Sequence, residues 1–413
     1  MRTVEEHLAG ILRAVGPLPA RPFPLDEAHG CVLAEDVYAT APLPGFDNSA
    51  MDGYAVRRVD VATASPERPV TLPVAADLGA GPGEPPPLAP GTAARIMTGA
   101  PVPPGADAVV PVEWTDGGAQ MPAGAPAGGT VRIGQAPRPG HHVRRAGEDL
   151  ARGALVLPAG ALLSAAQVGL LAAAGRDTVA VHPRPRVAVL STGSELVAAG
   201  RPLLPGRVAD SNGHALAAAA RQAGALAHRV GPVPDDAPLL LRLVEEQLDR
   251  VDALVTSGGV SVGAYDVVKQ VLAGLGTVAF GRVAMQPGMP QGFGVLRGVP
   301  VFTLPGNPVS ALVSFEVFVR PALRRMRGLP AAPPGEGQVE VGAALRSPAG
   351  KRSFLRVVVE RHDDGGLLAR PAGGQGSHQL AALAAADALL VVPEDVTDVV
   401  AGMRLAALPI GRS

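Results

Sequence analysis

Small and acidic residues follow a short apolar run in the second half of the chain. Residues 253–255 are apolar and lead into Thr256-Ser-Gly-Gly259, where small side chains let backbone N–H groups approach a ligand closely. A helix is predicted to begin close to Asp266, so its N-terminus would face the same point. Strand, glycine-rich turn and helix together favour an anion-binding site. The alternative is a plain turn whose glycines only permit the bend.

Three carboxylates, Glu195, Asp235 and Asp266, each follow a predicted strand. The carboxyl ends of parallel strands meet at one edge of a sheet, so we expect these side chains to share a rim with the turn at 305–308. Carboxylates hold Mg²⁺, which offsets charge on phosphoryl oxygens. The residues therefore predict a phosphorylated ligand with a divalent metal, unless the acids merely cap helices.

Composition narrows the class of protein. The chain has 413 residues, enough for two to four domains at about 100–200 residues each. With 36 Lys+Arg against 37 Asp+Glu, the formal charge is −1, which argues against nucleic acid or anionic membranes as partners. A single cysteine, Cys31, rules out internal disulfides and fits a reducing compartment. We found neither a secretory signal nor a membrane-length apolar run, so a cytoplasmic protein is expected.

The predicted elements change character along the chain. An amphipathic helix occupies residues 1–15, and short β segments separated by Gly and Pro follow as far as 142. From about residue 185, strands alternate with helices, which predicts a parallel sheet covered on both faces. Residues 338–413 alternate without a long helical period and fit a small β-barrel or sheet.

Seven motifs in collinear order resemble the MoeA family, the molybdopterin molybdenumtransferases, whose relatives include the gephyrin E domain and its plant counterpart. The motifs lie at Phe46–Ala55, Arg95–Ala100 with Gly105–Val110, Gly147–Asp149, Ser191–Leu196, Ser257–Gly263, Pro305–Ser310 and Gly376–His378. The resemblance covers nearly the whole chain.

The resemblance implies an α/β plus β fold of four domains. These are a discontinuous helical and extended linker domain (1–45 and 143–182), a β-rich second domain (46–142), a three-layer molybdopterin-binding domain with a parallel or mixed sheet (183–329) and a small C-terminal β-barrel (330–413). It also implies an elongated homodimer. Its site would lie between one protomer's α/β and C-terminal domains and the other's β-rich domain.

The implied activity is insertion of molybdate into adenylylated molybdopterin with Mg²⁺, releasing AMP and molybdenum cofactor. The implied catalytic residues are Asp52, Thr98, Asp149, Glu195, Asp235, Asp266, Arg282, Arg356 and Ser377. The implied pterin-nucleotide residues are Ser257, Gly258, Gly259, Ser261, Gln286, Pro287, Pro305, Gly306 and Asn307. Glu195, Asp235 and Asp266 are the metal candidates.

Arg356 suits a tetrahedral dianion because a guanidinium offers two N–H groups, but it could instead lie on a solvated strand face. Molybdopterin adenylyltransferase and molybdoenzyme maturation factors are the implied protein partners.

The chain departs from the family pattern where lysines are usual. Arg282 keeps the positive charge, whereas Gln286 and Met289 do not, and Ser194 stands where Asp is frequent. Each charge-assisted hydrogen bond not replaced would cost ~1.5–3 kcal/mol of oxyanion binding. The alternative function is therefore a catalytically weak paralogue that acts as a gephyrin-like scaffold. Molybdopterin adenylyltransferase ranks lower because it lacks the long N-terminal region. The sequence leaves the choice between molybdate and tungstate open.

Overall fold

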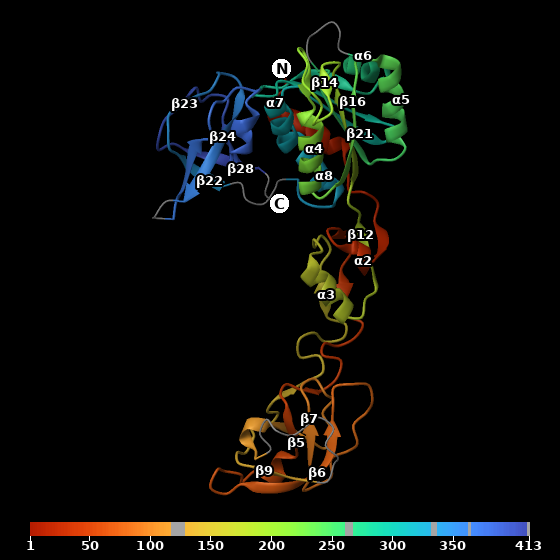
Figure 1. The fold of residues 1–413 in the computed structure, drawn as a ribbon, viewed down its shortest axis with the longest axis vertical. Helices are drawn as coiled ribbons and strands as arrows, with labels where there is room; N and C mark the ends of the chain where they lie inside the picture. Colours follow the sequence, from red (N-terminus) through yellow and green to blue (C-terminus); the bar gives the residue numbers. More distant parts are fainter. Residues whose placement is uncertain (117–128, 261–266, 332–336, 362–364, 411–413) are drawn as a thin grey trace. The chain divides into compact units, whose positions relative to one another are not determined.

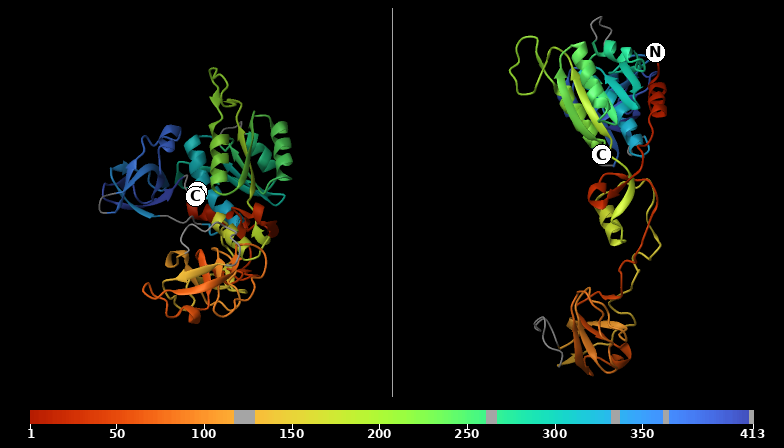
Figure 2. Two further views of the ribbon diagram at one scale, coloured as in Figure 1. Left: turned by 60° about the horizontal axis from the view of Figure 1, so that its bottom comes forward. Right: turned by 90° about the vertical axis from the view of Figure 1, so that its right-hand side faces the viewer.

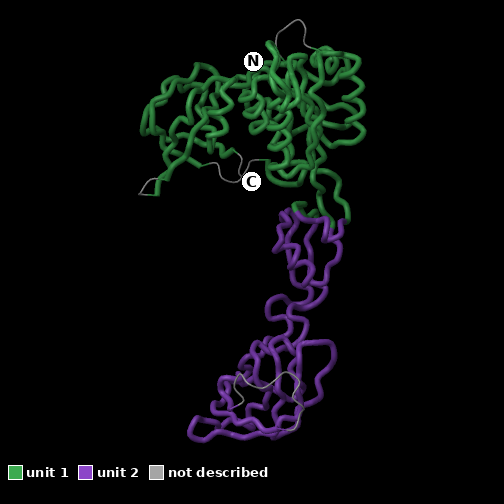
Figure 3. Tube along the Cα trace, viewed as in Figure 1, with its two compact units in different colours: residues 1–22, 30–34, 180–413 green, residues 23–29, 35–179 purple. Residues whose placement is uncertain are grey.

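The computed structural model describes residues 1–116, 129–260, 267–331, 337–361 and 365–410. The chain divides into two compact units, shown in green and purple in Figure 3. The first comprises residues 1–22, 30–34 and 180–413, and the second comprises residues 23–29 and 35–179. Ser261 and Asp266, two of the predicted site residues, lie outside the described residues.

A six-stranded mixed sheet forms the centre of the first unit (Figure 1). Its order is β16 (Leu226–Val233), β13 (Arg186–Thr192), β17 (Ala253–Ser257), β21 (Val299–Leu304), β20 (Pro290–Leu296) and β18 (Ala279–Arg282). The first four strands are parallel, and β20 runs antiparallel to both neighbours. The sequence predicted the parallel strands but not the antiparallel pair at this edge.

Both faces of the sheet are buried. Successive side chains of a strand point to opposite sides, so each strand contributes to a hydrophobic core on either face. Val187 and Val189 of β13 belong to one hydrophobic core, and Ala188 and Leu190 belong to the other. The first core is completed by α1 (Val4–Ala14), α4 (Ser211–Gln222), α7 (Pro308–Ser314) and α8 (Arg320–Met326). The second is completed by α5 (Ala237–Leu248) and α6 (Val267–Gly274). Helices therefore flank the sheet on both sides, which gives the predicted three layers (Figure 2).

The long helix predicted after β21 is divided into three parts. A π-helical stretch, Phe315–Val319, separates α7 from α8. Within it Glu316 is buried and forms a two-pronged ion pair with Arg320, which is also buried. A buried carboxylate is tolerated only when paired in this way, so the pair belongs to the core.

The C-terminal part of the first unit is a closed five-stranded barrel, as predicted. Its strands, in neighbour order, are β24 (Arg352–Arg361), β25 (Leu367–Pro371), β22 (Gly337–Val341), β28 (Arg404–Pro409) and β26 (Ala388–Val392), and β26 pairs again with β24. Strand β19 (Met285–Gln286) adds to the edge of β24, and α9 (Leu380–Ala384) lies between β25 and β26. The segment after β18 is thus hydrogen-bonded to the barrel.

The second unit contains the predicted β-rich domain. Its sheet has the order β8 (Ala108–Pro111), β5 (Gly53–Val56), β7 (Ala93–Ile96), β6 (Val70–Leu78) and β9 (Thr130–Ile133). The same unit holds the paired strands β4 (Asn48–Ser49) and β10 (Val143–Arg144), the pair β3 (Val37–Tyr38) and β11 (Leu155–Leu157), and helix α3 (Ala165–Ala173). The boundaries of the four domains remain predictions. None of the helices in the described part of the chain is long and apolar enough to span a bilayer.

His7 makes the stability of the first unit dependent on pH. The ring is 6% exposed and packs edge-on against Phe318, with centroids 4.7 Å apart. Burial, together with the nearby positive charge of Arg2, lowers the pKa of His7 to about 4. The unfolded chain therefore takes up a proton on His7 near pH 6.5, whereas the folded chain takes it up only near pH 4. The free energy of unfolding falls as the pH drops between these two values.

We predict that lowering the pH from 7 to 5 costs up to about 2 kcal/mol of unfolding free energy through this group. Urea denaturation at the two pH values measures the loss. The non-titrating variant His7→Gln should lose about that much less than the native chain over the same interval. Equal losses in both proteins would contradict the assignment.

Candidate functional site

A cavity of about 670 Å³ lies at the carboxyl ends of the parallel strands. Strand β13 pairs with β16 on one side and β17 on the other, so the chain order reverses there and a crevice opens between the strand ends. The lining combines loop residues from four strand ends: Ser191, Thr192, Gly193, Glu195, Leu196, Val208, Ala209, Asp210, Ser211, Asn212, Asp235, Ser257, Gly258, Gly259, Val260, Val267, Pro290, Pro305, Gly306, Asn307 and Pro308. We call it the rim cavity.

The glycine-rich turn after β17 forms one wall of the rim cavity. Gly258 and Gly259 have φ values of 96° and 75°, in the left-handed region that glycine adopts without strain. A Cβ on Gly258 would lie 2.5 Å from the carbonyl oxygen of Thr192. Only glycine therefore fits at position 258, a requirement that is compatible both with an anion-binding turn and with a plain turn.

Glu195 and Asp235 both line the rim cavity and are exposed. Ser194 holds Asp235 through two hydrogen bonds: its N–H donates to the carboxylate at 2.9 Å, and its Oγ accepts from the Asp235 N–H at 3.0 Å. No cation pairs with either carboxylate within the described residues, and no lysine or arginine lines the cavity there. The described lining therefore offers a phosphate no cationic side chain.

The described residues contain no group of three or more His, Cys, Asp or Glu side chains that could hold a metal alone. Mg²⁺ is commonly held by one or two carboxylates together with substrate phosphates. Glu195 and Asp235 offer that donor set, so the site fits a metal that binds with a phosphorylated ligand. The third predicted carboxylate, Asp266, lies outside the described residues.

Sequence reasoning missed two polar residues of the rim cavity. Asn212 donates through Nδ2 to the Ser257 Oγ and to the Gly306 carbonyl, both at 2.7 Å, and so joins the two glycine-containing turns. Ser191 is 1% exposed and its Oγ has no partner in the described part of the chain, which leaves a buried donor for a ligand. The Asp210-Ser-Asn sequence suggested only a helix cap. Asp210 does cap α4, but it also lines the cavity together with the next two residues.

The turn at 305–307 connects the rim cavity to the barrel. Asn307 lines the cavity and donates through Nδ2 to the Ser377 Oγ at 3.1 Å. The N–H of Val309 donates to the Ser377 carbonyl at 3.2 Å. The structure thus brings Ser377, predicted from the C-terminal motif, against the predicted pterin-nucleotide turn.

Arg356 of β24 is fully buried, so its alternative place on a solvated strand face is wrong. Leu355 and Val357 pack inside the barrel, while Phe354 packs in the core shared with α7 and α8. Alternation puts Arg356 on the side of Phe354, facing the α/β domain. Its Nη2 donates to the Gly374 carbonyl, whereas Nε and Nη1 have no partner among the residues that the structure describes. Burial lowers the pKa of this guanidinium, and no carboxylate of the described chain pairs with it.

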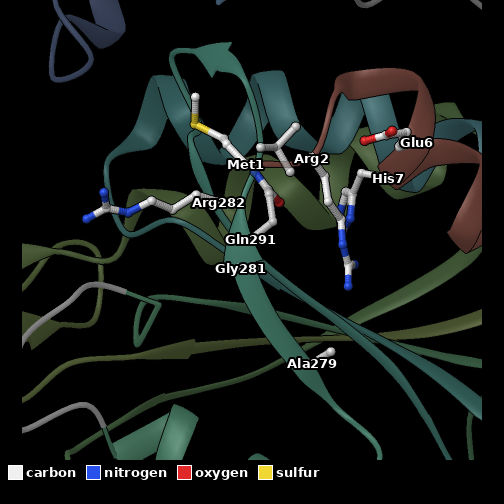
Figure 4. Close-up of a pocket in the computed structure, with 9 residues that line it drawn as sticks. Met1, Arg2, Glu6, His7, Ala279, Gly281, Arg282 and Gln291 are labelled. Carbon is white, nitrogen blue, oxygen red and sulfur yellow. The ribbon is translucent and has the colours of Figure 1, made fainter.

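Arg282, Gln286 and Pro287 do not line the rim cavity. Arg282 lines a separate cavity of about 280 Å³ with Arg2, His7 and Gln291. In Figure 4 the Arg282 side chain points away from Arg2 and His7. Gln286 is exposed and pairs with Ser353 at the edge of the barrel. The roles predicted for these three residues remain predictions.

Asp52 and Thr98 form a local pair in the second unit. The N–H and Oγ1 of Thr98 donate to the Asp52 Oδ1 at 2.7 and 2.8 Å, and these bonds lower the pKa of Asp52. Asp149 is exposed in the same unit, where its N–H donates to the Leu43 carbonyl at 3.0 Å. Each is available to a ligand, and their predicted roles stay predictions.

Comparison with known proteins places this geometry in a family. Three family models match in order: the MoeA N-terminal region (domain I and II) over residues 2–175, the probable molybdopterin-binding domain over 188–325 and the MoeA C-terminal region (domain IV) over 338–410. The chain belongs to the MoeA family.

Similar MoeA-family proteins cover almost the whole chain. Molybdopterin molybdenumtransferase 2 of Mycobacterium tuberculosis is 48% identical over 98% of each chain, and molybdopterin molybdenumtransferase 1 of that organism is 44% identical over 95% of each. The crystal structure of the molybdopterin biosynthesis MoeA protein of Pyrococcus horikosii matches with a TM-score of 0.77 and 32% identity over 98% of both chains. The predicted fold class and family are confirmed.

We predict that Asn212→Ala loosens both turns of the rim cavity. The variant loses two hydrogen bonds and leaves the buried Ser257 hydroxyl with one partner fewer, which should cost about 1–3 kcal/mol of stability. Hydrogen exchange of the Gly258 amide, which donates to the Leu304 carbonyl, should become faster. His214→Ala, an exposed change on the same helix, is the control. Unchanged exchange in Asn212→Ala would show that Asn212 does not hold the turns.

Proposed function

We propose that this MoeA-family chain is a molybdopterin molybdenumtransferase, which inserts molybdate into adenylylated molybdopterin and releases AMP and molybdenum cofactor. The observation that carries the proposal is the connection through Asn307 and Ser377. It joins a cavity built for a phosphorylated ligand to the segment that contacts a buried, unpaired arginine. One ligand can then be held beside a second, anionic reactant, which is what this transfer requires.

The rim cavity supplies the nucleotide-pterin half of the site. Ser257, Gly258 and Gly259 present backbone and hydroxyl groups at a topological switch point, where phosphorylated ligands are commonly bound. Pro305, Gly306 and Asn307 line the cavity directly beside this turn, since a Cβ on Gly306 would lie 3.7 Å from the Gly258 Cα. Asn212 joins the two turns, and the Ser191 hydroxyl, which has no partner among the described residues, can donate to the ligand.

The metal half of the proposal rests on Glu195 and Asp235. These two carboxylates would hold Mg²⁺, which when bound supplies positive charge to the phosphoryl oxygens. Ser194 fixes Asp235 by its two hydrogen bonds, so the Ser that replaces a frequent Asp positions a ligand rather than providing one. Asp266 is proposed as a further ligand from its motif alone.

Arg356 supplies the oxyanion half of the site. Its Nε and Nη1 lie on different edges of the planar guanidinium and have no partner among the described residues, so an oxygen of a tetrahedral dianion can accept from either of them. A buried guanidinium with unfilled donors gains more from an incoming anion than an exposed one does. Gln286 and Met289 carry no positive charge. Arg356 therefore contributes more of the free energy of oxyanion binding than it would with lysines at those two positions. Molybdate and tungstate both suit this chemistry.

We propose a homodimer in which Asp52, Thr98 and Asp149 of a second copy complete the site. An apolar hollow of about 400 Å³ supports a partner surface on the first unit; α4, α7 and α9 line it with Ala215, Ala218, Leu312 and Leu380. A cytoplasmic location, and contacts with molybdopterin adenylyltransferase and molybdoenzyme maturation factors, are proposed from the sequence.

We predict that the native chain releases AMP from adenylylated molybdopterin only when molybdate and Mg²⁺ are both present. Asp235→Asn keeps the shape of the side chain but removes its charge, so the Mg²⁺ concentration for half-maximal release should rise by about tenfold or more. Asp236→Asn is the control, because Asp236 caps α5 through the Leu239 N–H and asparagine caps equally well. AMP release no greater than background in the native chain would reject the transferase and favour a scaffold protein.

A further inference from the structure

We propose that Gln375 is a positioning residue for oxyanion capture: its side-chain amide holds the loop that orients Arg356 and carries Ser377. This inference rests on the proposed function and extends it to a residue outside the predicted site. The loop runs from Gly373 to Ser377, between β25 and α9.

The backbone of Arg356 lies where the β-ladder stops. The β24–β25 pairing ends at Val357 and Pro371, and the Ala372 N–H then donates to the Arg356 carbonyl at 3.0 Å. At Gly373 the chain turns away from the strand with a φ of 117°. The Arg356 N–H, which a continuing strand would have paired, therefore needs another acceptor.

The Gln375 side chain takes the place of the missing strand residue. Its Oε1 accepts from the Arg356 N–H at 2.9 Å, and its Nε2 donates to the Arg356 carbonyl at 3.1 Å. The same Nε2 donates to the Gly373 carbonyl, also at 3.1 Å. A single side chain thus ties the loop to both backbone groups of the buried arginine.

These hydrogen bonds fix the positions of the Gly374 carbonyl and of Ser377, which precede and follow Gln375 in the loop. The preceding carbonyl, that of Gly374, accepts from the Arg356 Nη2 and so leaves Nε and Nη1 as the free donors. Two residues later, the Ser377 hydroxyl and carbonyl accept from Asn307 and Val309. Gln375 therefore sets the orientation of the guanidinium relative to the turn that lines the rim cavity.

Two variants test whether Gln375 acts on oxyanion capture. Gln375→Ala removes all three hydrogen bonds and should raise KM for molybdate in the AMP-release assay about tenfold or more, with kcat at saturating molybdate changed less than about threefold. Gln375→Glu keeps the size and the acceptor but places a carboxylate beside Arg356, where it competes with the oxyanion. Its KM for molybdate should exceed that of Gln375→Ala.

The split between KM and kcat separates the proposal from a purely structural role. A structural role lowers stability and kcat in both variants, since a carboxylate at position 375 would also face the carbonyl oxygens of Arg356 and Gly373. Gln338→Ala, an exposed glutamine on β22 of the same barrel, is the control. Native activity with Gln375 variants that match this control, or that lower kcat without raising KM for molybdate, overturns the inference. An inactive native chain instead rejects the proposed function. Circular dichroism of each variant verifies the fold, and if Gln375→Ala is unfolded, Gln375→Glu decides by whether its KM rises without a matching fall in kcat.

Discussion

Arg356 brings a positive charge to the interface between the barrel and the α/β domain, where water does not reach it and no described carboxylate neutralises it. Burying such a charge costs free energy, so the fold keeps it only if its surroundings compensate or a ligand does. Here Nη2 donates to the Gly374 carbonyl, and the other two nitrogens, Nε and Nη1, have no partner among the described residues. By contrast, the buried Arg320 is paired with Glu316 through two hydrogen bonds. The difference leaves Arg356 with donors for an anion, and access to it requires local movement of the groups around it.

The described lining of the rim cavity, in contrast, lacks positive charge. The rim cavity is lined by three carboxylates, of which Glu195 and Asp235 have no ion-pair partner among the described residues, and by no described cation, so it can bind phosphate through backbone groups, hydroxyls, side-chain amides and an added metal. Arg356 is the opposite case, because it is a buried cation that has no anionic partner among the described residues. Asn307 and Ser377 join the two halves, and β19 hydrogen-bonds the segment after β18 to the barrel. The carboxylates of the rim cavity and the guanidinium of Arg356 are thereby held in separate places whose relative position is fixed. This arrangement suits a reaction that brings an oxyanion to a phosphorylated substrate.

Much of this could be predicted from the sequence because it follows from local rules. The apolar run before Ser257, the glycines after it and the acids after neighbouring strands are sufficient to assemble the rim, since parallel strand ends must meet. The antiparallel pair β18–β20 and the π-helical stretch were missed because short apolar runs do not encode strand direction, and a helical period does not reveal an extra residue per turn. Asn212 and Gln375 were missed as well. Their importance lies in hydrogen bonds to backbone groups distant in sequence, and an amide side chain gives no sign of these in advance.

The most direct test is to locate the oxyanion itself. Tungstate scatters anomalously and has nearly the size and charge of molybdate, so crystals of the chain soaked in tungstate should reveal where the anion binds. We predict an anomalous peak within hydrogen-bonding distance of the Nε or the Nη1 of Arg356, on the side of Ser377, and loss of that peak in Arg356→Lys, whose compact ammonium lacks the planar set of N–H donors. A peak instead beside Arg2 and Arg282, with nothing at Arg356, would contradict the account.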